Sequence, residues 1–174
     1  MEILQRLVDI IISPFKDPAM LWEVLPLVIT VLIIVLYFGR YKNEQLGWNS
    51  ALTNSLVLLY VGTNLLYYLY LNDSLSIFSE YTLVAIAVAL VGLSLAFLNY
   101  HHILPKKISF GIASVLPINF LAFLSIVFVH GHLKLDLSSL FAAIILFVII
   151  FSIVKLVQSR EEEAIDDIGE VIKI

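Results

Sequence analysis

The chain has 174 residues, of which 61% are apolar and 14% are charged, and its mean hydropathy is +1.01. Soluble globular domains are about half apolar and about a quarter charged, so this composition excludes a disordered chain, a fibrous protein and an ordinary soluble enzyme. The net charge of −4 gives no basic surface for nucleic acid. The absence of cysteine excludes thiolate chemistry and Cys-based metal sites. We therefore expect an all-α, polytopic integral membrane protein.

Residues 1–17 are too few to cross a bilayer and carry charges at Arg6 and Asp9. Apolar residues recur there at helical spacing, with the charged residues on another face, and Pro18 follows. This pattern predicts an amphipathic helix that lies in the membrane interface. The alternative is a frayed extension of the first span. The predicted apolar face consists of Ile3, Leu4, Leu7, Ile10, Ile11 and Pro14.

Five stretches are apolar and long enough to cross a bilayer, which takes about 20 residues per helix. The connecting loops are short and leave no room for a soluble catalytic domain. Glu23 lies about one turn inside the first span, where an interfacial carboxylate is the simplest interpretation. The sequence thus predicts one membrane domain over 1–157 and an acidic tail over 158–174. The five predicted transmembrane helices are 20–38, 51–71, 81–99, 109–129 and 137–157.

Three asparagines lie inside the predicted spans, Asn54 and Asn64 in the second and Asn119 in the fourth. In the second span the asparagines belong to a polar face, and such a face must meet protein or water. Two interpretations stay open. The amides line a path for a small neutral solute or a cation, or they form hydrogen bonds between helices, which we favour because this needs no cavity. The polar face consists of Ser50, Asn54, Tyr60, Asn64 and Tyr67.

Small residues line one face of the third span, at Ala85, Ala89, Gly92 and Ala96. Close approach of backbones favours helix packing in lipid, so we expect this face to contact protein and this helix to be the most enclosed. In the fourth span Pro117 removes a backbone hydrogen bond and predicts a kink. We expect Asn119 beside it, or a neighbouring hydroxyl, to bind the freed carbonyl.

The acidic tail carries six carboxylates between 161 and 170. Ile165, Ile168 and Ile172 recur in it at helical spacing, which predicts a short amphipathic helix. Because anionic lipid repels the acids, we expect this apolar face to dock on a partner protein. The alternative is a solvated end of the chain.

Basic residues are distributed unevenly between the two sides of the predicted five-span topology. Positive charge favours the cytoplasm, so the N-terminus is expected outside and the C-terminus inside, in the cell membrane. The side that includes the N-terminus carries Arg6, Lys16 and Lys134. The opposite side carries Arg40, Lys42, Lys106, Lys107, Lys155, Arg160 and Lys173.

Histidines occur in two pairs, His101 with His102 and His130 with His132. The predicted topology places the pairs on opposite faces, about 30 Å apart, so they cannot share an ion. Asp136 is the best candidate for a third ligand to the second pair, but histidines at interfacial helix ends are the simpler interpretation. We expect no metal site and no cofactor.

Chemical motifs are missing from the sequence. The spans contain no Asp, Lys, Arg or His, apart from Lys155 near the end of the last span, and Glu23 is their only Glu, which argues against a proton pump or a voltage sensor. No zinc-protease, nucleophile-elbow or phosphate-loop motif occurs, so we expect no catalytic residues.

Three functions remain open. The leading hypothesis is a non-enzymatic accessory or scaffold subunit that packs with itself or with a membrane partner. The first alternative is a small channel or transporter lined by Asn54, Asn64 and Asn119. The second is an interfacial enzyme acting on lipid or isoprenoid through the histidines or Glu23, which requires acids and a histidine clustered on one membrane face.

Overall fold

The structure is a computed structural model that describes residues 2–41 and 47–160. In these residues the chain folds into helices and no strand, which confirms the all-α class. Ile165, Ile168, Ile172 and the rest of the predicted tail from 161 onward lie outside the described residues. The helices are α1 (Glu2–Lys16), α2 (Pro18–Arg40), α3 (Trp48–Leu71), α4 (Glu80–Tyr100), α5 (Lys106–Ile112), α6 (Val115–His130) and α7 (Leu137–Arg160).

Four helical stretches in the described part of the chain are long and apolar enough to cross a membrane. They overlap four of the predicted spans and fit a multi-pass membrane protein. The remaining predicted span, 51–71, lies in α3, which is as long as the others but less apolar because it contains several Asn, Ser, Thr and Tyr residues. The four stretches are Pro18–Arg40, Glu80–Tyr100, Lys106–His130, which joins α5 and α6, and Leu137–Arg160.

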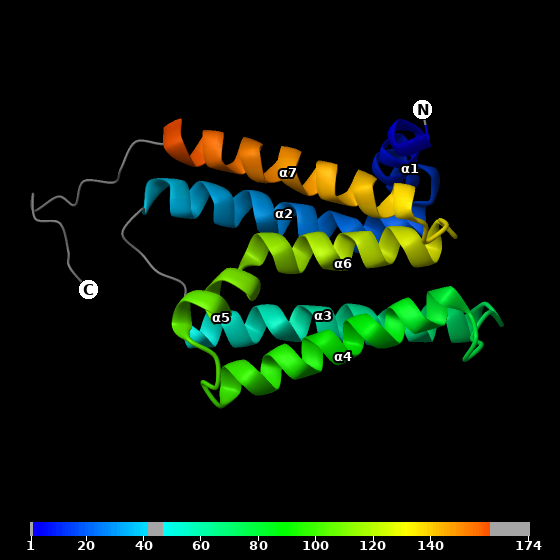
Figure 1. The fold of residues 1–174 in the computed structure, drawn as a ribbon, viewed down its shortest axis with the longest axis horizontal. Coiled ribbons are helices and arrows are strands. Elements are labelled where there is room, and N and C mark those ends of the chain that lie inside the picture. Colours follow the sequence, from blue (N-terminus) through cyan, green and yellow to red (C-terminus); the bar gives the residue numbers. More distant parts are fainter. Residues whose placement is uncertain (1, 42–46, 161–174) are drawn as a thin grey trace, which may run out of the picture.

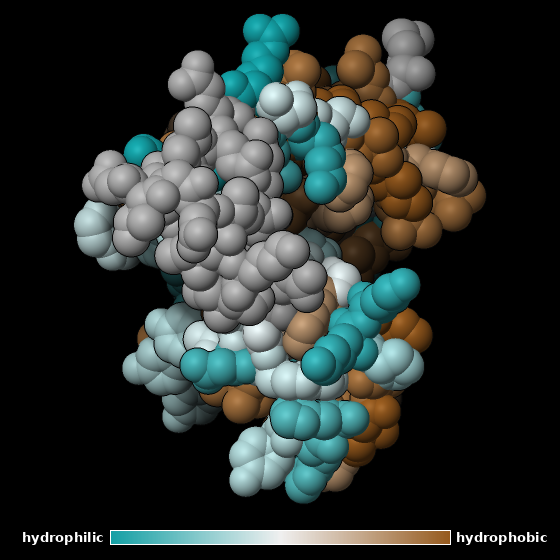
Figure 2. Space-filling model, turned by 90° about the vertical axis from the view of Figure 1, so that its left-hand side faces the viewer, coloured by the Kyte–Doolittle hydropathy of each residue, from teal (hydrophilic) through white to brown (hydrophobic). Residues whose placement is uncertain are grey.

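The long helices α2, α3, α4, α6 and α7 run side by side along the long axis of the molecule and alternate in direction (Figure 1). The helix α1 lies across the end where α2 begins and α6 ends, and contacts α7, α2 and α6. At the opposite end lies the short α5. Figure 2 looks onto that end and shows hydrophilic residues over its face and hydrophobic residues along one flank.

The most enclosed part of the bundle is the stretch formed by α5 and α6. Half of the residues in its most apolar 18-residue segment are buried inside the protein, against 28% in the corresponding segment of α4. The prediction that 81–99 is the most enclosed helix is therefore wrong. The physical reason is position: α6 lies between α2 on one side and α3 with α4 on the other, whereas α4 packs mainly on α3. A stripe of small residues predicts close contact with a neighbouring helix, but it does not predict how many helices surround the one that carries it.

Helices α3 and α4 form a close antiparallel pair. A methyl group added at Gly92 would overlap the backbone of Leu58 and Leu59, and one added at Gly62 would overlap the backbone of Ala89. Only glycine therefore fits at these two positions without a shift of one helix. Along the same stripe of α4, three of the four small residues are buried and the fourth is half-buried; the stripe is Ala85, Ala89, Gly92 and Ala96.

The helical stretch 106–130 is broken just before Pro117. The first part, α5, ends at Ile112, and α6 begins at Val115, so Pro117 lies in the first turn of α6. Because proline has no N–H, the carbonyl of Ala113 loses its helical donor. The donor that replaces it is the side-chain amide of Asn54 in α3, with 2.8 Å between Nδ2 and the oxygen. The expectation that Asn119 or a hydroxyl would fill this role was wrong.

The helix α1 divides its apolar residues between two faces. Ile10 and Pro14 are buried against the bundle, together with Ser13. The opposite side is left exposed. It is formed by the large apolar residues Leu4, Val8, Ile11 and Phe15, which are spaced as one helical stripe, with Ile3 and Ile12 beside them.

Candidate functional site

A buried histidine lies where the end of α6 meets the start of α2. His130 is the last residue of α6, and its side chain is only 1% exposed. Asp17 precedes α2 and caps it, since its carboxylate accepts the N–H of Ala19 at 2.9 Å. Glu23 follows in the second turn of α2. The capping geometry and the helical spacing together bring both carboxylates to the imidazole ring.

Each ring nitrogen of His130 faces one carboxylate. Nε2 lies 3.4 Å from Oε2 of Glu23, and Nδ1 lies 3.8 Å from Oδ2 of Asp17. Neither nitrogen has a hydrogen-bond partner among the described residues, so both contacts are electrostatic. Tyr68 of α3 stacks on the imidazole, with 3.7 Å between ring centroids and 16° between ring planes. The ring therefore has an acid at each nitrogen and an aromatic ring on one face.

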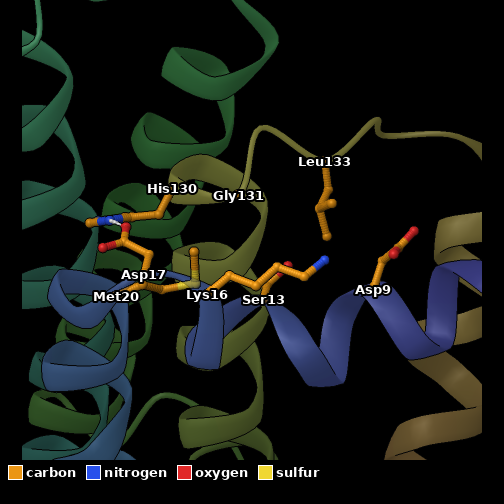
Figure 3. A pocket seen from close by; sticks show the side chains of 8 residues that line it. All are labelled: Asp9, Ser13, Lys16, Asp17, Met20, His130, Gly131 and Leu133. Atoms are coloured by element: carbon orange, nitrogen blue, oxygen red, sulfur yellow. Dashed lines mark ion pairs between the residues drawn. The ribbon is translucent and has the colours of Figure 1, made fainter.

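A small cavity adjoins this cluster, between α1, the start of α2 and the turn after α6. Its volume is about 260 Å³. In Figure 3 the ring of His130 points toward Asp17 and away from Ser13, the hydroxyl residue of the cavity wall. No nucleophile of the cavity wall is therefore paired with the imidazole as a general base would require. The lining residues are Asp9, Ser13, Lys16, Asp17, Met20, His130, Gly131 and Leu133.

An ion pair fastens α1 near the same end of the molecule. Arg6 of α1 binds Asp136, just before α7, with 2.6 Å between Nη2 and Oδ2. Asp136 also accepts the backbone N–H of Ser139 at 2.7 Å. Donation from this N–H, helped by the charge of Arg6, holds the pKa of Asp136 below its ordinary value. The residue that we considered as a third metal ligand is thus engaged with an arginine.

The two histidine pairs lie at opposite ends of the bundle, and within each pair the rings contact different partners. His101 packs on Phe97 and Tyr100, and His132 meets the ring of Tyr81 edge-on. His102 stacks on the indole ring of Trp48, the first residue of α3. Across the described ranges, no group of three or more His, Cys, Asp or Glu side chains is placed to hold a metal ion.

The asparagines inside the predicted spans have different surroundings. The amide of Asn54 donates to Ala113 of the α5–α6 break, as described above, and the amide of Asn119 donates to Val115 within α6 at 2.8 Å. Asn64 is half-buried. Two of the three amides are therefore engaged with backbone carbonyls.

Asn99, at the end of α4, is a buried polar residue that was not predicted from the sequence. It is 1% exposed, and its amide donates to the hydroxyl of Ser55 at 2.9 Å and to the carbonyl of Ala51 at 3.3 Å. Its oxygen accepts the hydroxyl of Ser109 from α5. A signal was present, because Asn99 continues the spacing of the small-residue stripe by one more step beyond Ala96.

The outward side of α3 is unusually polar for a helix among apolar neighbours. Tyr60, near the middle of the helix, is 69% exposed and forms no hydrogen bond through its side chain within the described part of the chain. The hydroxyl of Thr63 bonds back to the carbonyls of Leu59 and Tyr60. The exposed face consists of Thr53, Leu56, Tyr60, Thr63, Tyr67 and Tyr70. We call this set the α3 outer face.

The chain matches no protein-family model, no curated protein and no solved structure. Its function must therefore be inferred from the α3 outer face, the buried amides and the cluster at His130.

Proposed function

We propose that this chain is a non-enzymatic integral membrane protein that acts as an accessory or scaffold subunit and packs through the α3 outer face. The observation that carries the proposal is Tyr60. In the proposed topology its hydroxyl lies near the middle of the bilayer, where an unpaired hydroxyl costs about 2–7 kcal/mol. A second membrane helix, from another copy or from a partner protein, removes this cost by supplying an acceptor.

In the proposed topology five helical stretches cross the membrane, α3 included. The support for α3 is its length, its lack of charged residues and its position alongside α4 and α6 (Figure 1). The helix α1 is proposed to lie in the interface, because it runs across the end of the bundle and leaves Leu4, Val8, Ile11 and Phe15 exposed toward lipid.

The proposed orientation has the N-terminus outside and the C-terminus in the cytoplasm. Arg40, Arg160 and the two lysines that begin α5 lie at the end of the bundle opposite α1 (Figure 1), and basic residues favour the cytoplasm. The chain has no cysteine, so Glu44→Cys and Ser76→Cys give single labelling sites. A membrane-impermeant maleimide should label Ser76→Cys in intact cells and leave Glu44→Cys protected. The reverse pattern would overturn the orientation.

The two other functions receive less support. A path through the chain needs free amides, whereas those of Asn54 and Asn119 are engaged with backbone carbonyls. An interfacial enzyme needs acids and a histidine on one face, and His130 with Asp17 and Glu23 meets that condition. However, both ring nitrogens face carboxylates and no nucleophile of the cavity wall is paired with either, so the cluster favours binding over catalysis.

The test uses a nitroxide spin label at Thr63→Cys, on the α3 outer face, and at Leu32→Cys, on the exposed side of α2, as the matched control. Collisions with oxygen report lipid contact and collisions with a nickel chelate report water. In proteoliposomes, position 32 should collide with oxygen. Position 63 should be shielded from both reagents if copies of the chain pack together.

A photo-crosslinking amino acid at position 63 in native membranes detects a different partner protein. A crosslinked adduct at 63, absent when the probe is at 32, would support packing with a partner. Strong collisions with the nickel chelate at 63 would instead support a water-lined path. Oxygen collisions equal to those at 32, together with no adduct in native membranes, would overturn the proposed packing.

A further inference from the structure

We propose that His130, Asp17 and Glu23 form a proton-binding site that fastens the start of α2 to the end of α6. The ligand is a single proton, which the imidazole ring takes from a hydronium ion. An N–H bond forms on the ring, an O–H bond of the hydronium breaks, and water is left, so that the ring becomes an imidazolium held between two carboxylates. The proposal does not depend on what covers the α3 outer face.

The positions of the two nitrogens favour the charged ring. A neutral imidazole has one N–H donor and one nitrogen with a lone pair, and that second nitrogen would face a carboxylate without a proton between them. An imidazolium has a donor on each nitrogen, so both Glu23, at 3.4 Å, and Asp17, at 3.8 Å, face a donor. The described surroundings offer two acceptors and no donor to the ring nitrogens.

Burial makes this difference between the two forms matter. The side chain of His130 is 1% exposed, so water cannot readily substitute for the missing hydrogen bonds. Charges attract more strongly in such a site than in bulk water. The stacked ring of Tyr68 adds to the preference, because the face of an aromatic ring attracts a cation.

The other charged groups near the site do not replace the proton. On α1, Asp9 and Lys16 line the adjoining cavity, and Arg6 is bound to Asp136. The turn after α6 contributes Gly131 and Leu133 to the cavity wall, neither of which carries a charged side chain. The phenol of Tyr68 covers a ring face and does not lie at a nitrogen. The cavity of about 260 Å³ provides room for water to deliver the proton.

Proton binding has a defined consequence for stability. When the ring is charged, one residue of α6 binds both the cap and the second turn of α2. When the ring is neutral, Asp17 and Glu23 lose the positive charge that His130 supplied to them. The contact of both carboxylates with a charged ring exists only while the ring carries its second proton, so we expect its contribution in acid and its loss as the pH rises. The start of α2 should therefore be held more firmly in acid.

The experiment is a double-mutant cycle of His130→Gln and Glu23→Gln in the full chain, unfolded reversibly in mixed micelles at pH 5.5 and pH 8.5. The two values lie on either side of the ordinary pKa of a histidine side chain, about 6.5. At the lower pH the coupling between the two residues should change the folding equilibrium constant about tenfold, as for a charge-assisted contact. At the higher pH it should fall close to onefold.

His132→Gln with Glu23→Gln is the matched control, because the ring of His132 turns to Tyr81 and meets it edge-on. This pair should show no coupling at either pH. A coupling between His130 and Glu23 that is equal at the two pH values, or absent at both, would overturn the proposal.

If Glu23→Gln does not fold, ring ¹⁵N NMR of the wild-type chain gives the same answer. His130→Gln identifies the signal by its disappearance. Two protonated ring nitrogens for His130 at the lower pH, and one at the higher pH, would support the site. A ring that stays singly protonated at both values would refute it.

Discussion

The α3–α4 pair and the α2–α6 junction, where His130 meets the start of α2, bury polar groups in opposite ways. In the first region Asn99 is hydrogen-bonded to Ser55, Ser109 and a backbone carbonyl. In the second region His130 is also buried, yet neither nitrogen has a hydrogen bond among the described residues and both face acids.

This difference separates a polar group that holds helices together from one that is suited to bind a ligand. A neutral amide whose donors and acceptor are all hydrogen-bonded has no group free to bind a ligand, and its contribution to stability does not change with pH. A buried ionisable ring between acids changes its contribution with its charge. The α3–α4 pair should therefore respond to changes in side-chain size, and the α2–α6 junction should respond to pH.

The largest effect is expected from bulk between α3 and α4. Gly92→Leu places a side chain where even one methyl group overlaps the backbone of Leu58 and Leu59, so the helices must move apart. The expected cost is about 1–3 kcal/mol of unfolding free energy, the same at acid and neutral pH. Gly111→Leu is the control, because no atom lies near its added methyl. Equal unfolding midpoints of the two variants would contradict the packing described for α4.

Loss of the buried amide should have the next largest effect. Asn99→Leu has a similar volume but leaves the hydroxyls of Ser55 and Ser109 without this partner. We expect a loss of about 1–2 kcal/mol, again independent of pH. Unfolding in mixed micelles at the same two pH values checks both points. A loss that varies with pH would remove the distinction between Asn99 and His130.

A smaller effect is expected at the break between α5 and α6. Asn54→Leu removes the donor to the carbonyl of Ala113, which has no helical donor because Pro117 follows four residues later. Hydrogen bonds between membrane helices contribute about 0.6–2 kcal/mol, and we expect a loss in this range. Asn64→Leu, at a half-buried position on the same helix, should cost less. The reverse order would mean that Asn64 contributes more to the stability of the bundle than the bond from Asn54 to Ala113.

Local patterns in the sequence were enough to predict the helices but not the contacts between distant residues. The predicted spans 20–38, 81–99 and 137–157 lie within α2, α4 and α7, because an apolar run of sufficient length leaves few alternatives to a helix. The carbonyl of Ala113 accepts its hydrogen bond from Asn54, which lies 59 residues earlier in the sequence. The periodicity of a single segment cannot predict a hydrogen bond between two segments so far apart.

The cluster at His130 was beyond prediction for the same reason. Asp17 and Glu23 are far from His130 in the sequence. The position of Glu23 near the start of a span is typical of an interfacial carboxylate, and His130 is only two residues from His132. The close sequence spacing of His130 and His132 was misleading because His132 adopts a positive φ of 46° and its ring turns to Tyr81. By contrast, Asn99 was predictable from the spacing of the stripe that it extends.

The smallest effect, and the one with the opposite pH dependence, is expected at Arg6. The Arg6–Asp136 pair is partly exposed, so solvent screens it and its removal should have only a small effect on stability. The pKa of Asp136 is lowered in the folded chain, so the pair's contribution is present at neutral pH and is lost as acid protonates this carboxylate. In unfolding titrations of the full chain, the difference between wild type and Arg6→Gln should shrink as the pH falls toward and below the ordinary carboxyl range. Leu4→Ala, at an exposed position of α1, is the control and should show no such trend, because it removes no contact with an ionisable group. A difference that grows in acid would mean that Arg6 acts on the bundle through a group other than Asp136.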